Sequence, residues 1–102
     1  MVIFPPFRLD PDEGRLWKGE AVLALRKKPF AILCYLAAHP KKLVTHDELL
    51  VEVWRGAVVS DSAMRSHLHE LRQVLGDDVV ETVIGRGYRF VAALQSQVPA
   101  EP

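Results

Sequence analysis

Three side chains that can bind nucleic acid recur at helical spacing in the second half of the chain. They are Arg65, His69 and Arg72, at positions i, i+4 and i+7, which a helix places on one face. Guanidinium groups pair with the O6 and N7 atoms of guanine and form charge-assisted bonds with phosphate. The polar side chains beside them on the same helix are Ser62, Ser66 and Gln73. Two interpretations of this face stay open: a helix that reads base edges in a DNA major groove, or the ordinary solvated charges that surface helices carry.

Metal binding and catalysis are poorly supported by the same segment. His67 and His69 are two residues apart, so a helix directs them to nearly opposite sides, where one metal ion cannot bind both. Ser60 and Asp61 lie near these histidines, but no G-x-S-x-G elbow is present, and capping of the following helix explains both residues. We therefore expect no enzymatic activity, no metal site and no cofactor.

A flexible and basic turn lies near the end of the chain, in the stretch Gly85-Arg86-Gly87-Tyr88-Arg89-Phe90. The glycines free the turn, and Arg86 at its tip is available to a nucleic-acid backbone or minor groove. Tyr88 and Phe90 are expected to anchor the strand to the core. Two interpretations of Arg89 stay open: a similar contact with nucleic acid, or an ion pair with a carboxylate of the protein itself.

The overall composition limits the class of protein. The 102 residues hold 13 Lys and Arg against 13 Asp and Glu, so any affinity for nucleic acid must come from a local patch. The length suits one domain with its own core. Cys34 is the single cysteine and is expected to be a small core residue. Because the apolar runs are far shorter than a bilayer span and no signal-peptide pattern is present, we expect a cytoplasmic domain without membrane contact in this segment.

Short alternating runs separated by Gly, Pro and Asp clusters predict a small antiparallel sheet at the start of the chain. The predicted strands are residues 7–9, 15–17 and 21–25. Apolar residues from Phe30 to Ala37 then recur at helical spacing. They predict a helix that begins at about Lys28 and ends at His39, because Pro40 cannot continue it.

Two further helices are predicted from their capping signals. Thr45 and Glu48 form a capping box, in which Thr45 accepts from the backbone N–H of Glu48 and the glutamate side chain reaches back. That helix ends near Trp54. The next begins at Ser60 or Asp61 and stops at Gly76. The apolar stripe that must face the core in this third helix is Met64, Leu68, Leu71 and Leu75.

Two β-rich runs close the domain. Residues 79–83 and 88–91 predict a hairpin around the glycine turn. The composition changes after Ala93, so we expect one domain over residues 1–93 and a tail or the start of a linker over 94–102. A full-length protein could continue from there into a sensor or a membrane anchor. The predicted order of sheet, three helices and hairpin indicates an α+β fold, a helix-turn-helix followed by a β-hairpin wing.

Motifs in this order resemble the winged helix-turn-helix DNA-binding domain of OmpR/PhoB-type transcriptional regulators. The resemblance is to the CadC-like branch in particular, which carries this domain without a phosphoreceiver, and it covers about residues 7–92. It implies a four-stranded N-terminal sheet, a three-helix core and a C-terminal hairpin. The matching segments are Phe7-Arg8-Leu9-Asp10, Leu43-Val44-Thr45, Glu48-Leu49-Leu50, Val53-Trp54, Val59-Ser60-Asp61, Glu70-Leu71-Arg72, Leu75-Gly76-Asp77-Asp78, Glu81-Thr82-Val83 and Gly85-Arg86-Gly87-Tyr88-Arg89-Phe90.

The resemblance also implies roles for single residues, since the family inserts its third helix into the major groove. The base-reading positions correspond to Arg65, Ser66, His69 and Glu70. The positions that contact the DNA backbone correspond to Trp54, Ser62, His67, Arg72 and Thr82, with Gln73 beside them. Ile84 occupies the place of an arginine that often enters the minor groove in relatives, so Arg86 is expected to substitute for it.

These inferences predict a bacterial transcription regulator that binds a specific sequence of double-stranded DNA and acts in signal transduction at the nucleoid. Few basic side chains are available, and each neutralised phosphate contributes about −0.9 to the slope of log affinity against log salt. We therefore expect weak binding by a monomer or weak dimer and useful affinity only on tandem half-sites. Relatives contact RNA polymerase through the loop that corresponds here to residues 55–59.

A protein-interaction module on the same scaffold, with little affinity for DNA, is the alternative. The zero net charge, Ile84 and Glu70 favour it. Arg65 and Arg72 would then be ordinary charges of a solvated helix face. The matching positions of Arg65, Arg72 and Arg86 argue for DNA binding instead.

Overall fold

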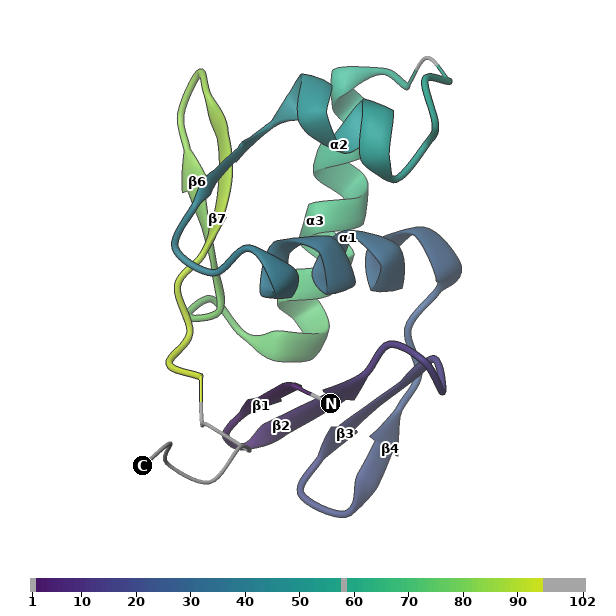
Figure 1. Cartoon of the computed structure of the whole chain (residues 1–102), viewed down its shortest axis with the longest axis vertical. Coiled ribbons are helices and arrows are strands. Elements are labelled where there is room, and N and C mark those ends of the chain that lie inside the picture. Colours follow the sequence, from purple (N-terminus) through teal and green to yellow (C-terminus); the bar gives the residue numbers. More distant parts are fainter. Residues whose placement is uncertain (1, 58, 95–102) are drawn as a thin grey trace, which may run out of the picture.

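A computed structural model describes residues 2–57 and 59–94 and places an antiparallel sheet at one end of the molecule (Figure 1). Its strands pair in sequence order, and β4 ends at Leu23 rather than at the predicted residue 25. The first strand was implied by the family resemblance but was not assigned from the residues themselves. The strands are β1 (Val2–Phe4), β2 (Phe7–Asp10), β3 (Arg15–Lys18) and β4 (Ala21–Leu23).

Helices α1 (Lys27–Ala38), α2 (His46–Glu52) and α3 (Asp61–Leu75) follow in the predicted order. Ser60 caps α3, because its hydroxyl accepts from the backbone N–H of Ala63 at 3.1 Å. Helix α2 is shorter than predicted. It stops at Glu52 because the chain turns at Arg55 and Gly56, which both adopt positive φ angles.

The C-terminal hairpin belongs to a second sheet of three strands in the order β5–β7–β6. Strand β5 (Leu43–Thr45) leads into α2, and β6 (Val80–Val83) and β7 (Gly87–Phe90) form the hairpin beside α3 (Figure 1). The sequence predicted the hairpin but not β5. The strand has three residues, the last of which is the helix cap, and so short a run carries no alternation that would indicate a strand.

The core joins both sheets to the helices. The predicted α3 stripe of Met64, Leu68, Leu71 and Leu75 is confirmed, since all four side chains are buried. Phe4 and Phe90 meet edge to face with ring centroids 5.2 Å apart, which ties the first sheet to the central strand of the second. Cys34 is half-buried at the edge of this core, and burial raises the pKa of its thiol to about 11.

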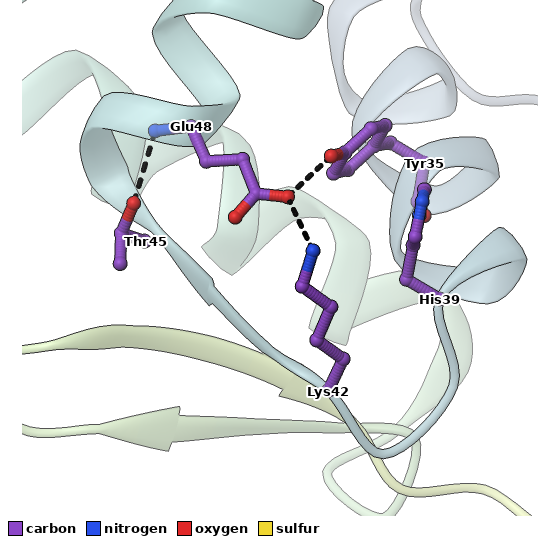
Figure 2. A network of polar contacts seen from close by, with 5 residues as sticks. All are labelled: Tyr35, His39, Lys42, Thr45 and Glu48. Carbon is purple, nitrogen blue, oxygen red and sulfur yellow. Dashed lines mark hydrogen bonds and ion pairs between the residues drawn. The ribbon is translucent and has the colours of Figure 1, made fainter.

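The capping box of α2 is only half formed. Thr45 Oγ1 accepts from the N–H of Glu48 at 3.0 Å as predicted, but the Glu48 side chain does not reach back (Figure 2). Its carboxylate instead accepts from the Tyr35 hydroxyl and, at 3.2 Å, from Lys42 Nζ. The hydrogen bond from the Tyr35 hydroxyl raises the energetic cost of protonating this carboxylate. Through the same bond, Glu48 connects α2 to α1 instead of closing its own capping box.

The network makes stability depend on pH. The hydrogen bond from Tyr35, followed by the contact with Lys42, lowers the pKa of Glu48 from 4.5, and the same hydrogen bond raises the pKa of Tyr35 to about 12. A lowered carboxyl pKa stabilises the fold above the unfolded-state value and loses that effect as the pH falls through the folded-state value. A raised tyrosine pKa stabilises the fold below pH 10 and loses that effect as the pH rises towards 12.

We therefore expect Glu48→Gln to lower the melting temperature by about 5 °C at pH 7 and by less at pH 3. At pH 3 the carboxylate of the unfolded chain, with its ordinary pKa of 4.5, is largely protonated, so the lowered folded-state pKa contributes less to stability than at pH 7. Thermal unfolding followed by circular dichroism at the two pH values measures the difference. Glu20→Gln, an exposed carboxylate in the β3–β4 turn, is the matched control. An equal loss at both pH values would contradict the assignment.

Candidate DNA-binding surface

The predicted base-reading side chains share the exposed face of α3. Arg65, Ser66 and His69 are all exposed, while the opposite side of the helix is buried in the core. The exposed Ser62 and Gln73 extend this face at its two ends, and Gln73 Nε2 lies 3.3 Å from His69 Nε2. The helix period alone separates the two sides, because hydrophobic residues occupy one stripe and hydrogen-bonding groups the other.

The wing stands beside the beginning of α3. Its turn is closed by the N–H of Arg86, which donates to the carbonyl of Val83 at 2.9 Å, and the Arg86 side chain is exposed. Gly85 has a φ of +76°, a conformation that favours glycine. A groove of about 690 Å³ separates the wing from the starts of α2 and α3. Its lining residues include Asp61, Arg65, Thr82, Ile84 and Arg86.

Arg72 and Thr82 face each other across the base of this surface. The Arg72 guanidinium donates to the Val80 carbonyl, from Nη2 at 3.2 Å and Nε at 3.4 Å, and to the Thr82 hydroxyl. Both residues were predicted to contact the DNA backbone. In the protein alone they join α3 to β6, so they also fix the wing relative to the helix.

Arg89 takes the second of its two interpretations in this structure. Its Nη1 lies 3.3 Å from Glu81 Oε1 on the neighbouring strand. A guanidinium engaged in this way is half-buried and stays on the sheet. Arg86 is therefore the better placed of the two wing arginines for an outside partner.

Glu70 is also engaged within the protein. Arg26 at the N-cap of α1 donates to both carboxylate oxygens, with Nε at 2.9 and 3.1 Å and Nη2 at 2.5 Å from Oε1. Hydrogen bonding to Arg26 is the largest influence that lowers the pKa of Glu70. This contact holds the Glu70 carboxylate towards Arg26 at the N-cap of α1.

Trp54 and His67 pack together at the junction of α2 and α3. Their ring centroids are 5.6 Å apart, and both side chains are half-buried. Lys28 lies over the Trp54 ring at 5.5 Å and donates to the Val53 carbonyl at 3.3 Å. The two predicted backbone contacts are thus held together with a lysine at their side, and they also have a structural role.

The model of the family described as "Transcriptional regulatory protein, C terminal" matches residues 19–90. The chain belongs to this family. The family comprises OmpR/PhoB-type DNA-binding domains of transcriptional regulators, and membership in it supports sequence-specific DNA binding in the regulation of transcription. The predicted family and fold are confirmed, including the three helices, the N-terminal antiparallel sheet and the C-terminal hairpin within the described residues.

Curated relatives are longer than this winged-helix domain. The phosphate regulon regulatory protein PhoB of Escherichia coli is 36% identical over 87 residues, which are 80% of this chain and 38% of that protein. The transcriptional regulator HilA of Salmonella typhi is 33% identical over 92 residues, 86% of this chain and 16% of that protein. The chain therefore spans less than two fifths of these relatives.

Solved structures agree with the fold of the winged-helix domain. The DNA-binding domain of Klebsiella pneumoniae RstA in complex with the RstA box has a TM-score of 0.76 at 28% identity, covering 88% of this chain and 96% of that one. The DNA-binding domain of E. coli CpxR reaches 0.79 at 28% identity, covering 91% and 98%. The DNA-binding domain of E. coli CadC reaches 0.81 at 23% identity, covering 92% and 94%, and shows the fold alone.

Several residues that shape this surface were not predicted from the sequence. Arg26 is 44 positions from Glu70, and Lys28 is 25 positions from Val53. His46 at the start of α2 lies 3.4 Å from Asp61 at the start of α3. Such separations follow no helical or strand period. The run Arg26-Lys27-Lys28 was the one available signal, a basic cluster at a helix start where the dipole disfavours it.

Proposed function

We propose that α3 lies in the major groove and that Arg65, Ser66 and His69 contact base edges there. The observation that carries this proposal is their common exposure on one face of α3, next to a groove that also contains the wing. Arginine and histidine donate to guanine, and serine hydroxyls suit several bases. Glu70 is left out of the base contacts because Arg26 engages both of its carboxylate oxygens.

The proposed contacts with the DNA backbone surround the exposed face of α3. We assign Arg86 to the backbone or minor groove beside the wing, because it is exposed at the tip and no hydrogen bond or ion pair of its side chain occurs within the described residues. We assign Arg72 and Thr82 to a backbone contact at the base of the wing, where one phosphate oxygen can accept from both the guanidinium and the hydroxyl. The remaining backbone contacts are Trp54, Ser62, His67 and Gln73.

The small number of basic side chains limits the affinity for DNA. The net charge is zero, so attraction must come from the local arginines of α3 and the wing. We propose that two domains occupy tandem half-sites and that the segment between α2 and α3 contacts RNA polymerase. In this proposal the domain acts at the bacterial nucleoid, in the cytoplasm.

Selection of duplexes from a random library tests the proposal. The recovered motif should be bound about tenfold more weakly by Arg65→Ala and by His69→Ala, because a good base contact contributes about 1–3 kcal/mol. Their binding to unrelated duplexes should change less. Fluorescence anisotropy with both duplexes measures this difference in specificity.

The Arg86→Ala variant distinguishes a contact with the DNA backbone from a contact with a base. It should weaken binding to all duplexes alike and reduce the salt slope by about 0.9, because one phosphate contact is lost. Arg15→Ala removes the same charge from the N-terminal sheet and should leave binding unchanged. Recovery of no motif, or equal effects of Arg65→Ala and Arg15→Ala, contradicts the proposed function.

A further inference from the structure

The acidic side chain in the middle of α3 is covered by a cation from another helix. Arg26 approaches the Glu70 carboxylate side-on, so that Nε reaches both oxygens, at 2.9 and 3.1 Å, and Nη2 reaches one at 2.5 Å. The contact crosses from the N-cap of α1 to the third turn of α3. Arg26 is 74% exposed in its side chain and Glu70 is 26% exposed.

The position of Glu70 borders the surface proposed to face DNA. It lies four residues after Ser66 and three before Gln73, and residues at these spacings are neighbours on a helix. Both of those side chains are exposed. An unpaired carboxylate at this place would stand close to the phosphates that line the groove, where like charges repel.

Stability does not explain the pair. Ion pairs exposed to this degree contribute little to folding, because water screens the charges and ordering two long side chains costs entropy. The same pair matters more in a complex with DNA, since the phosphates multiply the number of negative charges that a free carboxylate would meet. The consequence of the contact is therefore expected in binding rather than in folding.

Building on the proposed function, we propose that Arg26 is a positioning residue of the DNA-binding surface. It neutralises Glu70 and holds its carboxylate against α1, so that the exposed face of α3 can approach phosphates without repulsion. Arg26 itself does not contact the DNA in this arrangement. The partner is the polyanionic backbone, so the effect applies to every duplex sequence.

Four proteins test the inference: wild type, Arg26→Ala, Glu70→Gln and the double variant. In fluorescence anisotropy at about 0.1 M salt, Arg26→Ala should bind both the selected and an unrelated duplex about threefold more weakly. Glu70→Gln should stay within about twofold of wild type, and the double variant should recover that affinity with an unchanged salt slope. Arg15→Ala is the control for loss of one distant positive charge, and circular dichroism checks that all variants fold.

Each other result overturns the inference. A loss that persists in the double variant, with a salt slope reduced by about 0.9, means that Arg26 contacts a phosphate directly. A loss with Glu70→Gln on the selected duplex alone means that Glu70 reads a base. No effect of Arg26→Ala means that the pair is irrelevant to binding, whereas the proposed function still stands if Arg65→Ala loses specificity. A wild-type protein that binds no duplex overturns both.

Discussion

Gly87→Ala should push β5 away from β7 and strongly weaken both the fold and DNA binding. A Cβ atom added at Gly87 would lie 2.1 Å from the carbonyl oxygen of Val44 and 2.8 Å from the Cα of Thr45. Both are backbone atoms of β5, which pairs with β7 at this position, so no side chain can move aside to make room. We expect a loss of about 3 kcal/mol in the free energy of unfolding.

The functional consequence of Gly87→Ala follows from the position of β5. That strand leads directly into the Thr45 cap of α2, and β7 carries the wing, so separating them displaces both. Urea unfolding and anisotropy with the selected duplex measure the two effects. Gly85→Ala is the matched control, because space around Gly85 is open and only its φ of +76° is unfavourable, at a cost of about 1 kcal/mol. Equal stability of the two variants would falsify the steric argument.

Phe90→Ala is expected to have the other large effect. Phe90 is fully buried in β7 and packs edge to face on Phe4 of the first sheet. Truncating a buried phenylalanine costs about 3–5 kcal/mol, and a domain of this kind has only about 5–15 kcal/mol to lose. We expect the melting temperature to fall by about 15 °C or more.

Calorimetry with a neighbouring control checks this result. Val91→Ala removes a partly exposed apolar side chain one position later and should change the melting temperature by a few degrees at most. Phe4→Ala combined with Phe90→Ala should cost less than the sum of the two single changes, because both remove the same contact. Strict additivity would show that the two sheets are stabilised independently.

The capping residues and the apolar stripes made much of the fold predictable. Ser60 and Gly76 mark the two ends of α3, and Pro40 ends α1, because each acts through the backbone of its own neighbours. The exposed face of α3 was equally predictable, because Leu68 and Leu71 fix which side of the helix is buried. The end of α2 was predicted near Trp54 from the exit signal of Gly56, but the helix stops at Glu52, because the turn also includes Arg55, whose positive φ no residue type indicated.

Periodicity and capping act over a few neighbouring residues, so the positions of the helices, the polar side of α3 and the family indicated by the order of motifs could be read from the residues. Three contacts became known from the folded coordinates instead: β5 pairs with β7, Glu48 binds Tyr35 rather than its own cap, and Arg26 covers Glu70. Those contacts join segments whose separation follows no period, so they exist only once the core has brought the elements together.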